Sequence, residues 1–406
     1  MSNRYVWVVA GGIMQIPMLK EIKSRGYKIL LTDGNPDAPG KEYADQFVVL
    51  DTYDVFGHLN LASALQETPI AVLAVAADVG PTVSAIADEF DLPAVDYEVA
   101  KSVRDKAKMR EILGIDFPVW KEIQFNELEP ALSWRLQCRR KGLDQYYPCV
   151  VKPLNGAGSK GVTIVKTPFK WDKATKDARA YTKEGNSFLV EQYIDAEIEI
   201  ATDNFIIDGK VVFANAVKRY FSKDIFGLEL GHLNPYTLNT EIKRKIEFAA
   251  KQLDVDYGPF KCDFIYNEKY GWVIAECATR LSGGFDHMYA ANVATGKDIT
   301  GFMLDVALGE KLSSRDKRLW NTNKKFAFTY APILKPGKVA DISIPECNSD
   351  EHPYLKYVFV TMKNDTIEPL INCTQRPLFI ITEGDTEYQA IKNAKIIERN
   401  IKIEYE

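Results

Sequence analysis

The chain lacks the residue groupings that mark several common protein classes. Its cysteines include no C-x-x-C pair, which favours free thiols in a reducing compartment over a disulfide framework or a zinc site; they are Cys138, Cys149, Cys262, Cys277, Cys347 and Cys373. Its histidines are not clustered at metal-ligand spacing; they are His58, His232, His287 and His352. Internal repeats and low-complexity segments are also absent from the sequence.

Excess positive charge and long apolar runs are missing too. A net charge of -5 and a pI near 5.7 argue against a general nucleic-acid binder, although local basic sites for phosphates remain open. The apolar run Tyr5–Ala10 is too short for a signal-peptide core or a membrane span, so we expect the first strand of a cytoplasmic protein with no membrane partner. With 406 residues, 46% of them hydrophobic, the chain has room for two or three ordinary domains.

The first hundred residues alternate short β-rich runs with helical patterns, and this alternation predicts a parallel, doubly wound sheet. The turn Gly11-Gly12 and the acid Asp33, about twenty residues on, are similar to a dinucleotide fingerprint. The full G-x-G-x-x-G is absent, which favours a substrate cleft at the strand ends. A nicotinamide-dependent oxidoreductase stays as an alternative.

After this sheet the pattern becomes helical, with Asp105 placed to cap a helix from Lys106 to Leu113 that stops at Gly114. We therefore set a boundary near residue 100. An α+β unit follows, and residues from about 324 onward contain short strands and a terminal helical stretch. The predicted organisation is an N-terminal domain over 1–100, a central domain over 101–315 and a small C-terminal domain over 316–406.

The stretch from Val150 to Val162 joins an apolar strand carrying Lys152 to a glycine loop. Its glycines allow positive φ and bring backbone N–H groups close to an anion, and Lys160 adds charge; they are Gly156, Gly158 and Gly161. The spacing is not that of the nucleotide P-loop, and β-branched residues follow at once. We expect a phosphate-holding loop between two antiparallel strands, with a plain hairpin as the alternative.

Asp263 and Glu276 lie on two predicted strands joined by a polar turn. If the turn is centred between Lys269 and Tyr270, the two acids face each other, and Ile265 faces Ile274. Like charges directly opposite are destabilising unless something compensates, and two carboxylates plus substrate phosphates commonly hold magnesium. The alternatives are a pairing of one acid with Arg280 or Lys261, or a register that differs by one residue.

Glu191 and Glu199 bound the segment E-Q-Y-I-D-A-E-I-E. Exposed backbone at Gln192–Ile194 would present an N–H and a C=O to a purine edge, with an acid near the ribose hydroxyls. Alternating acids on a strand are more often a solvated face. Both interpretations stay open on these residues alone.

The order of these motifs resembles the ATP-grasp superfamily of carboxylate–amine and carboxylate–thiol ligases. The order is Asp105-Lys106, V-V-K-P with G-x-G-S-x-G, V-E-Q-Y-I, a Glu-rich strand, an Asp strand and E-x-x-x-R-L-S-G-G. The resemblance runs from roughly residue 100 to 310 and is closest to the L-amino-acid ligase and carbamoyl-phosphate synthetase-like branch. It implies an α/β and α+β fold: a Rossmann-like parallel sheet, two α+β subdomains around the nucleotide, and a small C-terminal α+β region. A glycine-loop lid is expected at about 145–195.

The resemblance also implies roles for individual residues. ATP would be held by Lys106, Lys152, Gly156, Gly158, Ser159, Gly161, Glu191, Gln192, Ile194 and Glu199, with Glu197 competing for the ribose. Asp263 and Glu276 would hold Mg²⁺, or Mn²⁺ in its place. Arg280 and Lys152 would act in catalysis, and the substrate would meet Arg280, Ser282, Gly283, Gly284 and His232. Ala278 departs from the family, because many members have Asn there, so a second metal ion would lack that ligand.

The activity implied is an ADP-forming C–N ligase that activates a small carboxylic acid, with an amino acid favoured, as an acyl phosphate and joins it to an amine. A bicarbonate-using carboxylase of the biotin carboxylase or carboxyaminoimidazole ribonucleotide synthetase type is the alternative within the superfamily. A non-catalytic nucleotide-binding module is a further rival. The partners expected are small molecules, and a homodimer is the family-level expectation.

Overall fold

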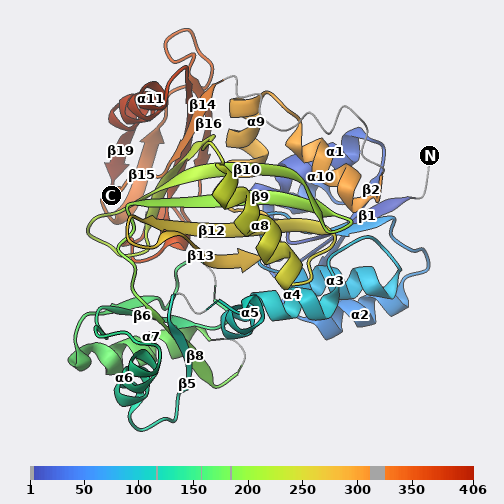
Figure 1. Cartoon of the computed structure of the whole chain (residues 1–406). Helices are drawn as coiled ribbons and strands as arrows, with labels where there is room; N and C mark the ends of the chain where they lie inside the picture. Colours follow the sequence, from blue (N-terminus) through green and yellow to red (C-terminus); the bar gives the residue numbers. More distant parts are fainter. Residues whose placement is uncertain (1–3, 116–117, 157, 183–184, 311–324) are drawn as a thin grey trace.

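The computed structural model describes residues 4–115, 118–156, 158–182, 185–310 and 325–406. A large sheet lies at the centre of the molecule, with the N-terminal sheet on one side, a small sheet below and the C-terminal region above (Figure 1). Among the described residues, no helix combines the length and the apolar character needed to cross a bilayer.

The N-terminal sheet is parallel, as its alternating pattern predicts. Its strands run in the order β3-β2-β1-β4, with bounds β1 (Tyr5–Val9), β2 (Lys28–Asp33), β3 (Gln46–Val49) and β4 (Ala71–Leu73). Helices cover both faces, so β1 is buried on both: Val6 and Val8 pack with α1 (Ile16–Ser24), while Trp7 packs with α2 (Val55–Ala64) and α3 (Gly80–Glu89). Asp33 Oδ2 accepts a hydrogen bond from the Gly11 backbone N–H at 2.7 Å, so this acid stabilises the turn itself.

The capped helix lies where local sequence signals place it. It is α5 (Lys106–Leu113), which follows α4 (Tyr97–Arg104). Asp105 Oδ1 accepts hydrogen bonds from the N–H groups of Ala107 and Lys108, and Gly114 ends the helix with a φ of 62°. The cap fixes Lys106 in the first turn, pointing toward the glycine loop.

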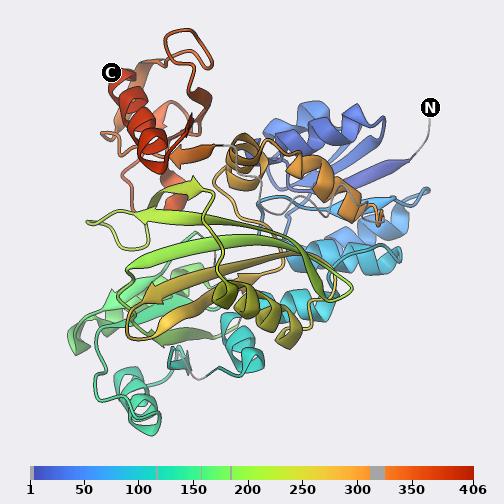
Figure 2. The same ribbon diagram turned by 45° about the horizontal axis from the view of Figure 1, so that its top comes forward.

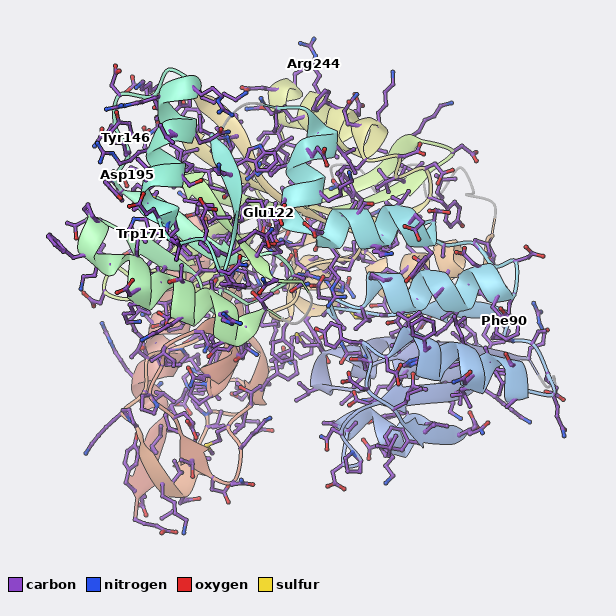
Figure 3. The ribbon with its side chains drawn as sticks, turned by 90° about the horizontal axis from the view of Figure 1, so that it is seen from below. Phe90, Glu122, Tyr146, Trp171, Asp195 and Arg244 are labelled. Carbon is purple, nitrogen blue, oxygen red and sulfur yellow. The ribbon has the colours of Figure 1, made fainter. Side chains whose placement is uncertain are left out.

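The small sheet has the order β5-β8-β6-β7 and carries the glycine loop between its antiparallel strands β6 and β7, as predicted. The strands are β5 (Trp120–Gln124), β6 (Cys149–Pro153), β7 (Thr163–Val165) and β8 (Ser187–Gln192). One face packs on α6 (Pro130–Arg140) and α7 (Trp171–Tyr181) through Trp134 and Trp171. Figure 3 shows Tyr146 and Trp171 together on this unit, far from Phe90 in the N-terminal part.

The large sheet has eight strands in the order β13-β12-β9-β10-β11-β14-β18-β16. They are β9 (Ile198–Ile207), β10 (Lys210–Phe221), β11 (Glu229–Asn234), β12 (Gly258–Asn267), β13 (Gly271–Ala278), β14 (Phe326–Tyr330), β16 (Leu355–Val360) and β18 (Leu378–Gly384). Helix α8 (Thr240–Gln252) lies across one face of this sheet, and Figure 2 shows the helix in front of the strands. The buried residues Ile242, Ile246 and Phe260 belong to the core between them.

Three strands of the C-terminal region extend this same sheet, because β14 pairs with β11 and β18, and β18 pairs with β16. The remaining α-helices and β-strands of the described residues are α9 (Ala291–Thr295), α10 (Ile299–Ala307), α11 (Glu387–Asn400), β15 (Gly337–Ser343), β17 (Thr366–Ile367) and β19 (Lys402–Tyr405). The boundary at 315/316 lies outside the described residues, so the division into domains stays a prediction.

One predicted register is wrong in part. Asp263 does pair with Glu276, but Ile265 pairs with Val273 instead of Ile274. The turn closes one residue earlier than predicted, and a bulge on β13 between the pairs restores the register of the two acids. The bulge therefore keeps both carboxylates at one position on the sheet despite the shifted turn.

Candidate functional site

A cavity of about 520 Å³ lies between the small sheet and the large sheet. This volume is in the range typical of small-ligand pockets. Most of the predicted nucleotide and metal residues line it: Lys106, Lys152, Gly156, Gly158, Ser159, Glu191, Gln192, Ile194, Glu199, Asp263 and Glu276. Sequence positions as distant as those on α5 and β13 are thus brought to one place.

A buried ion network forms the floor of the cavity. Lys152 Nζ lies 2.5 Å from one carboxylate oxygen of Glu191, and Arg110 Nε lies 2.9 Å from the other. The Arg110 guanidinium also donates to the carbonyl oxygens of Ile274 and Ala275, each at 2.7 Å. The network therefore joins α5, the small sheet and the bulged strand β13.

Burial and charge oppose each other in this network. Burial raises the pKa of Glu191, but Arg110 and Lys152 outweigh it and lower the pKa below its ordinary value. Burial lowers the pKa of Lys152, and the Glu191 carboxylate opposes that shift. Glu191 was expected to hold adenine; in the structure its carboxylate is engaged by two cations, which fits a role in fixing Lys152.

Arg110 was not among the predicted site residues, although it lies one helical turn after Lys106. The only available signal was the helix pattern itself, since residues four apart share a face. Its side chain is 1% exposed, and only the fold shows that its partner is Glu191, 81 residues later.

Lys106 connects the glycine loop to the acid pair. Its Nζ donates to the Gly156 carbonyl oxygen at 2.8 Å and lies 2.9 Å from Glu276 Oε1. Burial raises the pKa of Glu276, but the nearby lysines, Lys106 first, lower it well below its ordinary value. Glu276 is therefore ionised at neutral pH and available as an oxygen ligand.

Asp263 lies opposite Glu276 on the sheet. Its carboxylate forms an ion pair with Lys261, and its Oδ2 lies 3.5 Å from Arg219 Nη1. Within the described residues, no group of three or more His, Cys, Asp and Glu side chains could hold a metal ion. Two hard carboxylates lining this cavity do fit Mg²⁺, which is commonly bound through one or two carboxylates, substrate phosphates and water. The donor set of this pair is incomplete until phosphates are present.

Arg219 is a second residue outside the predicted site set, because the sequence pair Lys218-Arg219 suited an anionic substrate and a solvated surface equally. It is on β10, lines the cavity and lies among three acids: Glu229 at 3.0 Å, Asp263 at 3.5 Å and Glu199 at 3.9 Å. Glu197, the competing candidate for the ribose, instead accepts a hydrogen bond from the Glu268 N–H in the β12–β13 turn. Glu199 is thus the one of the two that lines the cavity.

Burial raises the pKa of Glu199 to about 6, with Arg219 opposing and Asp263 adding to the shift. The folded protein then binds this proton more tightly than the unfolded chain, so the free energy of unfolding falls as pH rises from about 4.5 through 6. Between pH 4.5 and 7, the free energy of unfolding of Glu199→Gln should rise by about 1–2 kcal/mol relative to that of wild type. Urea unfolding of both proteins at several pH values measures this; a constant difference would contradict it.

The last residue of β8 and the residues that follow it also line the cavity. Gln192 N–H is engaged by the Val119 carbonyl at 2.8 Å, and Ile194 is nearly buried. The Tyr193 ring lies near the exposed Phe226, with centroids 6.3 Å apart. The apolar rings and backbone groups of this part of the lining suit a flat heteroaromatic base.

The glycine loop has positive φ at two of its three predicted glycines, whereas Gly156 does not have a positive φ. Gly158, Ser159 and Gly161 have φ values of 69°, 60° and 71°, and Ala157 lies outside the described residues. Gly161 does not line the cavity: a Cβ there would lie 2.8 Å from the Asp177 carbonyl oxygen, so it allows the loop to pack on α7.

The predicted substrate residues lie apart from the cavity wall. Arg280 Nε is 3.3 Å from Asp78 Oδ1 of the N-terminal part, and the Ser282 N–H donates to Asp203 at 2.7 Å. A Cβ on Gly284 would lie 3.0 Å from the His232 ring, and Gly283 lies near Met14. Burial lowers the pKa of Arg280, but Asp78, Glu276 and Asp263 raise it above its ordinary value. Arg280 therefore interacts electrostatically with the two acids that line the cavity.

Several buried polar atoms beside these residues have no hydrogen-bond partner in the structure. They are Asp203 Oδ2, Ser282 Oγ, His232 Nε2 and both ring nitrogens of His287. Unpaired buried polar atoms are costly, so such a group normally meets water or a polar ligand. The region around Asp203, Ser282 and His287 therefore suits a small polar substrate.

Comparison with known proteins gives one matching family model, that of the ATP-grasp domain, over residues 145–286. Methylcrotonoyl-CoA carboxylase subunit alpha from mitochondria of Mus musculus is 27% identical over 191 residues, which are 43% of this chain and 25% of that protein. D-alanine–D-alanine ligase of Geotalea uraniireducens is 31% identical over 159 residues, 37% of this chain and 49% of that protein. The chain thus spans about half or less of the length of these relatives.

Solved structures match over the full length. L-amino acid ligase from Bacillus licheniformis has a TM-score of 0.78 and 20% identity, with 100% of both chains covered. Phosphoribosylglycinamide synthetase from Anaerococcus prevotii has a TM-score of 0.76 and 17% identity, again with 100% of both covered. The predicted fold class is confirmed by these matches together with the parallel N-terminal sheet.

Proposed function

Because this chain contains an ATP-grasp domain, we propose that it is an ATP-dependent, ADP-forming ligase that joins a small carboxylic acid to an amine. The observation that carries the proposal is the convergence of Lys106, Lys152, Asp263 and Glu276 on one cavity. Two cations, two carboxylates and apolar rings that line one cavity match the groups that a magnesium nucleotide would meet.

The chain's own residues would orient ATP in the cavity. Lys152, fixed by Glu191, and Lys106, fixed by α5, would neutralise phosphate oxygens, while the N–H groups of the glycine loop cradle them. The segment Gln192–Ile194 would receive adenine, and Glu199 the ribose. Asp263 and Glu276 would hold Mg²⁺, which supplies further neutralisation of phosphate charge when bound.

The acid substrate would lie between this phosphate end and Arg280. A carboxylate oxygen attacks the γ-phosphorus in line, the bond to the β–γ bridging oxygen breaks, and ADP leaves with an acyl phosphate formed. The amine then attacks the acyl carbon, and inorganic phosphate departs with the carboxylate oxygen. Arg280 and the N–H groups of Ser282–Gly284 would stabilise the carboxylate and the developing oxyanion.

An amino acid is the favoured acid substrate. Support comes from Asp203, which accepts the Ser282 N–H through one oxygen and whose second oxygen has no hydrogen-bond partner among the described residues, so it would meet an ammonium group. The named activity of the Bacillus licheniformis structure is in the same chemical class.

The test is a screen of paired substrates. We expect ADP and phosphate release when ATP, Mg²⁺ and the correct amino acid and amine are combined, with the condensed product detected by mass spectrometry. Lys152→Ala should abolish release, while Lys101→Ala, at a side chain 59% exposed, should leave it unchanged. Intact turnover in both Lys152→Ala and Glu276→Ala would show that the site is elsewhere.

A carboxylase that uses bicarbonate is the second candidate, favoured by the match to a carboxylase subunit. It shares carboxylate activation by ATP, so the cavity alone does not separate the two. ADP formation that depends on bicarbonate and needs no amino acid would select it.

A further inference from the structure

A short C-terminal segment contacts the backbone of Glu229 at the start of β11. Cys373 Sγ accepts a hydrogen bond from the Glu229 N–H at 3.4 Å and donates to the Gly227 carbonyl at 3.3 Å. Arg376 Nη1 donates to the Glu229 carbonyl at 3.0 Å, and its Nε donates to the Cys373 carbonyl at 2.8 Å. Both polar backbone groups of Glu229 are therefore bound by residues about 145 positions later in the chain.

The Glu229 side chain in turn holds two groups that face the site. One oxygen lies 3.0 Å from Arg219 Nη2, which lines the nucleotide cavity. The other lies 3.3 Å from His232 Nδ1, beside the predicted substrate region. Burial raises the pKa of Glu229, but Arg219 and then His232 lower it well below its ordinary value, so the carboxylate stays ionised. The position of this one carboxylate therefore sets the positions of both partners.

The same segment also meets the glycine loop. A Cβ on Gly158 would lie 3.2 Å from the Thr374 methyl group, and a Cβ on Gly227 would lie 3.3 Å from Ser159. The short helix Cys373–Gln375 that carries Thr374 is stabilised by a capping box between Asn372 and Gln375. The C-terminal region and the small-sheet unit approach the same end of the large sheet (Figures 1 and 2).

We propose that Arg376, assisted by Cys373, is a positioning residue of the reaction: it fixes the Glu229 backbone, and through the Glu229 carboxylate it holds Arg219 and His232 in place. This inference rests on the proposed function. It gives the C-terminal region a direct task in the site, although that region lies outside the matched domain model. Misplacement of a site group by about 1 Å costs up to about 100-fold in rate.

The kinetic test uses Arg376→Ala, with Arg399→Ala on the exposed end of α11 as the matched control. We expect kcat to fall about 10- to 100-fold, while the KM for ATP changes less than about threefold, since Lys106 and Lys152 are untouched. Arg376→Lys keeps one donor and should recover part of the loss; Cys373→Ser should likewise lose less than Cys373→Ala. Unchanged kcat in folded Arg376→Ala would overturn the proposal.

A double-mutant cycle separates positioning from general destabilisation. If Arg376 acts through Glu229, adding Arg376→Ala to Glu229→Gln should lower kcat by less than about threefold further. If the kcat loss of the double variant equals the product of the two single losses, Arg376 does not act through Glu229. A thermal melt of every variant identifies any that does not fold.

Hydrogen exchange tests the same contact without turnover. Arg376→Ala should speed amide exchange over residues 222–232 by about tenfold, with no change over 258–278. If wild type forms no ADP with any substrate, the proposed function fails while this measurement still decides the contact. Unchanged exchange over 222–232 would overturn the positioning role even in an active enzyme.

Discussion

Glu191→Ala should lower the free energy of unfolding by about 3–5 kcal/mol, because it leaves Arg110 and Lys152 buried with their shared carboxylate removed. Arg110 keeps its two carbonyl partners, but those accept hydrogen bonds without neutralising its charge. Glu191→Gln, which keeps the shape and one acceptor, should lose less. Urea unfolding without nucleotide measures the difference.

The control is Glu247→Ala at an exposed position of α8, where a change of less than about 0.5 kcal/mol is expected. The pKa of Glu191 is lowered on folding, so its contribution is present at neutral pH and is lost as pH falls through the folded pKa. The deficit of Glu191→Ala should therefore shrink in acid. A loss below about 1 kcal/mol at pH 7 would mean that the network is not held as the structure has it.

Glu276→Gln should reduce ATP turnover by about 10²–10³, because it removes one of the two opposed carboxylates while keeping the shape of the side chain. A metal ion held by this pair would stabilise phosphate charge by several kcal/mol, and an amide is a weaker ligand than a carboxylate. The reaction should also need more Mg²⁺ to reach half of its maximum rate. Initial rates of ADP formation across a magnesium titration measure both effects.

Glu241→Gln provides the matched change at an exposed glutamate of α8, and its rate should equal that of wild type. Asp263→Asn should resemble Glu276→Gln, since the two acids share one position on the sheet. Lys106 retains its bond to the Gly156 carbonyl in Glu276→Gln, which limits the structural damage. Turnover within threefold of wild type, at the same magnesium requirement, would rule out this pair as the metal site.

Local signals in the sequence predicted the elements that position the site. Asp105 and Gly114 bound α5 because a carboxylate cap and a positive-φ glycine act within one turn. The glycine loop between β6 and β7 follows from glycines and β-branched residues a few positions apart. The facing of Asp263 and Glu276 was also predicted, but the bulge that produces it was not, because one extra residue on β13 leaves no pattern of its own.

The remaining site residues depend on contacts between distant parts of the chain. Arg110 reads as an ordinary helix cation, and its burial against Glu191 follows only from the docking of α5 on the two sheets. The sequence fits Arg219 equally well as a surface residue and as a residue that reaches an anionic substrate. Cys373 and Arg376 reach Glu229 across more than 140 residues, which no periodicity or spacing rule records. The cytoplasmic location and the homodimer stay predictions.

The most direct test of the proposed reaction follows one oxygen atom. The protein is incubated with ATP, Mg²⁺, an amine and amino acids whose carboxylates carry ¹⁸O, and the released phosphate is analysed by mass spectrometry. An acyl phosphate requires that one carboxylate oxygen leaves with phosphate, so we expect one ¹⁸O in each phosphate released with product. ADP formation accompanied only by unlabelled phosphate, or release of AMP and pyrophosphate, would contradict the account.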